Sequence, residues 1–306
     1  MATSTQVVPA VETRGVLALW HLLSLDAPTV AVVWTWFVAR ADHVRLPWAT
    51  PAAMGIAVWM LYVGDRLLDA RLLDAPVRSG GQGLAVLEAR HLFHYRHRRG
   101  FLLGIGVVGV VLAALLPRLD GRAVRLYLGE GAVLFGWFAI LHGTRNAHRL
   151  PKEIATGLFF AAAIFIPTVA REPGLRVGLA PVAILFAGLC SLNCLLIYAW
   201  EGKSAKWENK SGNWKDRDGD WVREAHPSTR WAVRHLGALA MVEAMAGVGL
   251  GVFDPGAPGV LGWACGLACL VLVGLDRWRG RISPITLRAA ADLALLTPLI
   301  FLGFIR

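Results

Sequence analysis

Two aspartates stand four residues apart where an apolar stretch ends, in the segment YVGDRLLDAR. At 100° per residue, Asp65 and Asp69 lie about 40° apart on a helix and one turn apart along it. Like charges this close repel, and a divalent cation relieves the repulsion because Mg²⁺ prefers carboxylate oxygens as ligands. The pair therefore predicts a magnesium site. The alternative is a solvated helix end, in which the acids pair with Arg66, Arg71 or their neighbours.

The composition indicates which kind of element carries this pair. Of the 306 residues, 56% are hydrophobic and 17% are charged, whereas about a quarter of a soluble protein is charged. Apolar runs of 18 or more residues recur, and each can cross a hydrocarbon layer of about 30 Å. We therefore expect one all-α integral-membrane domain over residues 1–306. Its nine predicted transmembrane helices are 16–39, 48–67, 100–117, 123–142, 152–170, 178–200, 231–252, 258–275 and 284–305.

The basic residues predict the orientation of this bundle. With the N-terminus in the cytosol, 21 Lys and Arg fall on the cytosolic side and 8 on the other. The positive-inside rule favours that orientation, which also makes the loops 68–99 and 201–230 cytosolic. Flanking residues of this kind, near anionic lipid headgroups, account for the net charge of +10 without a nucleic acid. In a bacterium the protein would lie in the cytoplasmic membrane.

A second acidic helix end follows four spans later. YVGD (62–65) and YAWE (198–201) share a tyrosine followed three residues later by an acid. The second and sixth predicted spans both end at the cytosol. This weak repeat therefore predicts that the helix ends with Asp65 and Glu201 lie close together at the cytosolic opening of the bundle.

In this arrangement the chain resembles the UbiA superfamily of intramembrane prenyltransferases. Those proteins are nine-helix bundles with two Asp-rich motifs at the cytosolic ends of spans two and six. The first family motif reads N-D-x-x-D-x-x-x-D, and here Gly64 replaces its asparagine while the second acid moves to Asp69. In the second motif Asn193 fits, but Cys194 and Ile197 stand where the family has aspartates. The second motif is thus degraded.

The resemblance implies a function. Mg²⁺ would bind the diphosphate of an isoprenoid donor, and the prenyl chain would be transferred to a lipophilic acceptor or cyclised in an apolar chamber. The expected partners are these two substrates and the bilayer, with no obligate protein partner. The implied catalytic residues are Asp65 and Asp69, the metal ligands Asp65, Asp69 and Glu201, and the diphosphate-binding residues Lys152, Arg145 and Asn193. Candidate aromatic residues of the chamber are Trp34, Trp36, Trp59 and Phe160.

The alternative function is a non-catalytic descendant of this fold or a small-molecule transporter. Ionisable groups inside spans are costly and normally face the interior of a bundle, and Asp26 and Glu243 are such groups. A proton-coupled transporter would use acids of this kind. The spacing of three residues between His91, His94 and His97 could ligate a metal or haem. The amphipathic basic stretch around them favours a helix on the membrane surface instead.

Overall fold

The structure is a computed structural model that describes residues 16–71, 89–143, 150–208, 225–254 and 256–304. Within these ranges the chain is helical and has no β-strand, which confirms the all-α prediction for them. The α-helices are α1 (Val16–Leu22), α2 (Asp26–Ala41), α3 (Ala49–Arg71), α4 (Ala89–Arg96), α5 (Arg98–Leu115), α6 (Gly121–Gly143), α7 (Lys152–Arg171), α8 (Arg176–Glu208), α10 (Pro227–Arg234), α11 (Leu236–Phe253), α12 (Ala257–Trp278), α13 (Pro284–Ala294) and α14 (Pro298–Phe301).

Seven of these helical segments are long and apolar enough to cross a membrane. They are α5, α6, α7, α8, α11, α12 and the segment Pro284–Phe301. The pair α1 and α2 passes the same test only as a bent span. The 23-residue helix α3 is not among them, and its last two turns hold four charged residues. Seven or eight spans are therefore supported, and the count of nine stays a prediction.

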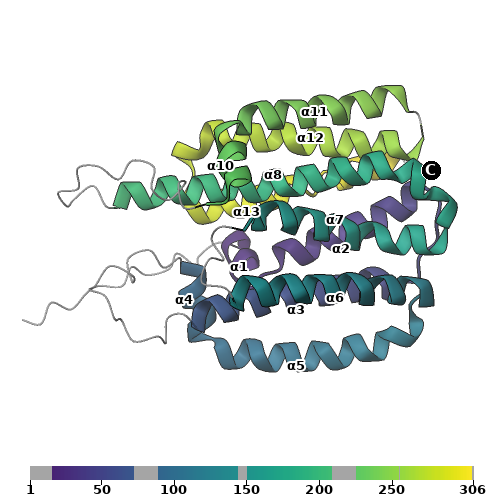
Figure 1. Ribbon diagram of the computed structural model, residues 1–306, viewed down its shortest axis with the longest axis horizontal. Coiled ribbons are helices and arrows are strands. Elements are labelled where there is room, and N and C mark those ends of the chain that lie inside the picture. Colours follow the sequence, from purple (N-terminus) through teal and green to yellow (C-terminus); the bar gives the residue numbers. More distant parts are fainter. Residues whose placement is uncertain (1–15, 72–88, 144–149, 209–224, 255, 305–306) are drawn as a thin grey trace, which may run out of the picture.

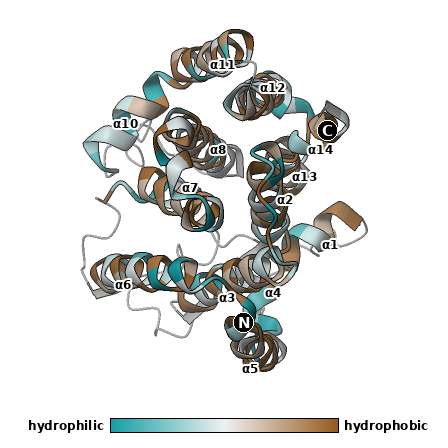
Figure 2. Cartoon of the chain, turned by 90° about the vertical axis from the view of Figure 1, so that its right-hand side faces the viewer, coloured by the Kyte–Doolittle hydropathy of each residue, from teal (hydrophilic) through white to brown (hydrophobic). Residues whose placement is uncertain are grey.

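The long helices lie side by side along one axis of the molecule (Figure 1). Helix α3 packs between α2 and α5, α7 packs on α8, and α11 packs on α12. Figure 2 looks along the bundle and shows apolar residues on the outer helices α5, α6 and α11. Large hydrophobic side chains such as Val110, Phe135 and Met245 are exposed there. An apolar outer surface of this kind suits lipid rather than water.

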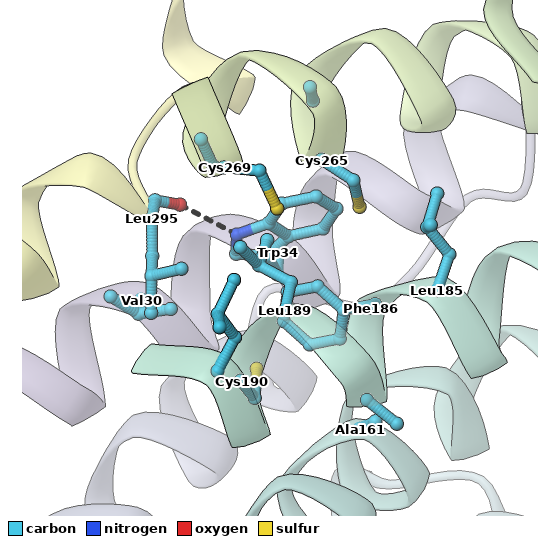
Figure 3. Close-up of a cluster of buried hydrophobic side chains, with 14 of the residues drawn as sticks. Val30, Trp34, Ala161, Leu185, Phe186, Leu189, Cys190, Cys265, Cys269 and Leu295 are labelled. Atoms are coloured by element: carbon cyan, nitrogen blue, oxygen red, sulfur yellow. Dashed lines mark hydrogen bonds between the residues drawn. The ribbon is translucent and has the colours of Figure 1, made fainter. Parts of the chain in front are cut away.

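The core of the bundle lies where α2 meets α8 and α12 (Figure 3). Trp34 is fully buried, and its ring lies 4.2 Å from that of Phe186. Its indole N–H donates to the carbonyl of Leu295 at 2.7 Å, just after α13 ends. Trp34 therefore packs the core instead of lining a chamber, and Trp36 is 42% exposed. For Trp34 the predicted chamber role is wrong, and for Trp36 it stays a prediction.

The elements next to the two predicted cytosolic loops lie at one end of the molecule. The end of α3, helix α4, the end of α8 and helix α10 all lie at the left of Figure 1. The first turn of α7 and the short helix α1 lie at this end too. The segments that carry the two acidic motifs therefore end on the same side of the bundle.

Candidate functional site

A sharp break separates the two N-terminal helices. Three residues lie between α1 and α2, and the two helix axes differ by 88°. Ser24 has a φ of 59°, one of two positive values at a non-glycine residue in the described ranges. Its N–H donates to the carbonyl of His21 at 3.0 Å. The predicted span 16–39 therefore consists of two helices with a break between them.

Arg66 of α3 forms hydrogen bonds to residues at the break. Its Nη1 donates to the carbonyl of His21 at 3.1 Å and to the hydroxyl of Ser24 at 2.7 Å. The guanidinium carbon also lies 4.2 Å from the centre of the Tyr62 ring, in a cation–π contact. Arg66 is only 3% exposed. The alternative of a solvated helix end is therefore wrong for this residue.

His94 of α4 binds the same serine. Its Nε2 lies 3.1 Å from the hydroxyl oxygen of Ser24, and its ring stacks on Phe101 at 4.4 Å. His94 is fully buried, so the prediction that it lies on the membrane surface is wrong. His97 is exposed as predicted, and the side chain of His91 lies outside the described part.

Asp26 begins α2 and is fully buried. One carboxyl oxygen accepts from the N–H of Ala27 at 3.0 Å. The other lies 2.6 Å from Nδ1 of His21 and 3.7 Å from Nη2 of Arg66. The N-terminus of a helix also favours a negative charge. The carboxyl group is thus held by its own helix, by the preceding helix and by α3.

Helices α8 and α13 complete this group. The buried carboxyl group of Asp292 has an oxygen within 4.8 Å of a carboxyl oxygen of Asp26. Asn193 of α8 donates from Nδ2 to Oδ1 of Asp292 at 3.0 Å. We call this buried group the junction cluster, and its members are His21, Ser24, Asp26, Arg66, His94, Asn193 and Asp292. Two buried carboxyl groups this close together, with an imidazole beside them, can share a proton or bind a cation.

The structure describes the side chains of only some residues of the two predicted acidic motifs. Asp65 is half-buried and directly precedes Arg66 on α3. Asp69 and Glu201 are helical, but their side chains lie outside the described part. Helix α8 continues unbroken from Asn193 to Glu201, a rise of about 12 Å. These two residues therefore do not share one ion.

Of the two basic residues predicted to bind diphosphate, the structure describes Lys152 but not Arg145. Lys152 is exposed at the first position of α7. Its neighbour Glu153 is buried and accepts a hydrogen bond from Thr229 of α10 at 3.1 Å, which fixes the start of α7. Arg145 lies outside the described residues.

Sequence reasoning noted Asp26 but did not connect it with the other members of the junction cluster. Three polar residues, His21, Ser24 and Asp26, fall within six consecutive positions of an apolar stretch, just before Pro28. Such a group of polar residues inside a span is a signal for irregular backbone that lines a protein interior. Its partners on α3, α4, α8 and α13 lie too far away in the sequence to be found in this way.

Comparison of the chain with known protein families, with curated proteins and with solved structures gives no match. The class of the protein therefore comes from its own helices. The chain is an integral membrane protein, an all-helical bundle with a buried polar cluster at a broken helix.

The pairing of Arg66 with Asp26 can be tested by a double-mutant cycle. Arg66→Met should lower the free energy of unfolding by about 3–5 kcal/mol, because it leaves a buried carboxylate without its cation. Asp26→Asn should also destabilise, and the double variant should lose less than the sum by about 2 kcal/mol. Denaturant unfolding in detergent measures each value.

The matched control is the half-exposed pair of Arg279 and Asp276, 2.5 Å apart. Arg279→Met should cost no more than about 1 kcal/mol, because solvent screens that pair. Strictly additive losses at Arg66 and Asp26 would show that the two side chains do not interact.

Proposed function

We propose that the protein is an intramembrane prenyltransferase-like enzyme that binds an isoprenoid diphosphate at the end of the bundle where α3 and α8 finish. The observation that carries the proposal is the link between the two motif-bearing helices. Asn193 of α8 binds Asp292, which lies within 4.8 Å of Asp26, and Asp26 pairs with Arg66 of α3. The cluster thus fixes α8 against the helix that ends in Asp65 and Asp69.

The residues at this end fit the proposed ligand in chemical type. Asp65 and Asp69 offer carboxylate oxygens one helical turn apart, which suits Mg²⁺, and Glu201 is a third candidate ligand. The metal ion would supply charge neutralisation of the diphosphate leaving group. Lys152 and Arg145 would bind the diphosphate oxygens through charge-assisted hydrogen bonds. In this proposal Asn193 acts through its contact with Asp292, which positions α8, instead of binding the diphosphate directly.

The apolar part of the substrate needs an apolar surface. Phe160 is partly buried and packs against Phe186 with ring centres 6.3 Å apart. Trp59 is held by a hydrogen bond from its indole N–H to the carbonyl of Leu23 at 3.1 Å. These two aromatic residues remain candidates for contact with the prenyl chain.

A small-molecule transporter is the second candidate, and the helix break favours it. Transporters commonly place binding groups where a membrane helix is interrupted, and Asp26 begins α2 directly after the break. Glu243 adds a further carboxyl group in α11, where one of its buried oxygens has no hydrogen-bond partner. A transporter would show flux in liposomes that is lost in Asp26→Asn or Glu243→Gln.

The proposed orientation has the N-terminus in the cytosol, with positions 80 and 212 on the same side. An impermeant thiol reagent applied from outside should not label a cysteine introduced at either position. Labelling from outside would show that the protein has the opposite orientation.

The proposed enzyme function predicts Mg²⁺-dependent binding of farnesyl or geranylgeranyl diphosphate to the purified protein. Asp65→Asn and Asp69→Asn should each weaken that binding at least about 100-fold, equivalent to about 2.7 kcal/mol for the loss of a charged metal ligand. Titration calorimetry with and without Mg²⁺ measures the change. The control is Glu172→Gln. It changes an exposed acid just after the C-terminal end of α7, whereas Lys152 lies at the N-terminal end of that helix.

Unchanged Mg²⁺-dependent binding in both aspartate variants would reject the proposed site. Absence of any binding by the wild-type protein, together with flux that needs Asp26, would favour the transporter.

A further inference from the structure

We propose that His21, Asp26 and Asp292 form a binding site for one divalent transition-metal ion, separate from the predicted Mg²⁺ site at Asp65 and Asp69. Each residue offers one ligand atom, and these atoms all lie within 4.8 Å of one another. All three side chains are buried. They come from α1, α2 and α13, so a bound ion would join both sides of the helix break to the C-terminal part of the bundle.

Asn193 is an independent indication of a missing ligand. Its side chain is 5% exposed, and its Oδ1 is buried without a hydrogen-bond partner. The other end of the same amide group donates to Oδ1 of Asp292 at 3.0 Å. Buried polar atoms are nearly always satisfied, so an unpaired acceptor beside a carboxyl group calls for an unseen partner. A cation bound near Asp292 would be such a partner, with the amide oxygen as a candidate further ligand.

The charges of the junction cluster favour a cation. Asp26 and Asp292 place two carboxyl oxygens within 4.8 Å of each other, and Arg66 brings one positive charge to Asp26. Nη2 of Arg66 has no hydrogen-bond acceptor, although Oδ2 of Asp26 lies 3.7 Å away. Repulsion between carboxylates is strong where water is excluded. A divalent ion would offset that repulsion.

The ligand atoms select the kind of metal. One imidazole nitrogen with two carboxylate oxygens suits Zn²⁺, Mn²⁺ or Fe²⁺, whereas Mg²⁺ prefers oxygen ligands and retains several waters. An ion would have to lie between Nδ1 of His21 and Oδ2 of Asp26, which are now 2.6 Å apart. With metal–ligand distances of about 2.0–2.2 Å, this contact would open by roughly 0.5–1 Å.

The groups around the proposed ligands would orient them for a metal. The N–H of Ala27 holds one oxygen of Asp26, and Asn193 holds one oxygen of Asp292. Arg66 binds the carbonyl of His21 and so fixes the backbone at that ligand. Supporting contacts of this kind are a general feature of metal sites. The ion would stabilise the break whether or not the protein binds a diphosphate.

The test uses the full chain, purified in detergent with any affinity tag removed, stripped with a chelator and titrated with Zn²⁺. The wild-type protein should bind one Zn²⁺ per chain in the junction cluster, and Zn²⁺ should raise its unfolding temperature. His21→Gln and Asp292→Asn should each weaken this binding at least about 100-fold, since even loss of a supporting contact costs about 10–100-fold. Elemental analysis after dialysis gives the stoichiometry.

Two sets of control variants separate this site from others. Glu243→Gln removes a buried carboxyl group outside the cluster and should leave Zn²⁺ binding unchanged. Asp65→Asn with Asp69→Asn should also leave it unchanged, which separates this site from the proposed diphosphate site. Equal Zn²⁺ binding by wild type, His21→Gln and Asp292→Asn would overturn the proposal, because it would place the ion on exposed groups such as His97 or His235.

Asn193→Asp provides a test that does not depend on losing a ligand. It adds a third carboxyl group to the cluster, so it should tighten Zn²⁺ binding and should lower the unfolding temperature only in the presence of chelator. Without a metal site the added charge would destabilise the protein equally with and without Zn²⁺. That second result would also overturn the proposal.

Discussion

Asp26 and Arg66 lie 3.7 Å apart inside the bundle, and neither charge could be buried there alone at low cost. The break between α1 and α2 creates the need for both. It interrupts the helical hydrogen bonds near His21 and Ser24, which are both buried, and an unpaired buried polar group costs about 1–3 kcal/mol. Arg66 supplies the donors, and Asp26 compensates its charge. The broken helix and the buried arginine therefore depend on each other.

This constraint determines how the proposed substrate end of the bundle is built. Arg66 lies directly after Asp65, so the contacts of Arg66 with the break fix the turn of α3 from which Asp65 projects. Asp292 extends the same cluster to Asn193 on α8. The two helices that carry the acidic motifs are thereby held by buried polar contacts instead of by apolar packing alone. A substitution in the junction cluster should therefore disturb both motifs together.

The sequence predicted the long helices well but not the break. The predicted spans 100–117 and 123–142 lie within about two residues of α5 and α6, because length and hydropathy alone define a helix that faces lipid. Residues 16–39 are apolar almost throughout, so hydropathy does not reveal the 88° bend. His94 was misplaced because an amphipathic basic stretch resembles a surface helix, whereas its burial depends on Ser24, 70 residues earlier. Long-range polar pairing of this kind leaves no periodic signal.

The most direct test of this account is whether the helix break contacts α4. In a variant whose four native cysteines are replaced by alanine, Ser24→Cys with His94→Cys should be joined by a short bifunctional thiol reagent, because these side chains now lie 3.1 Å apart. Mass spectrometry of the linked peptides measures the yield. Ser24→Cys with His97→Cys should link poorly, because His97 is exposed close to one turn away. Equal yields for the two pairs, or no link between positions 24 and 94, would contradict the account.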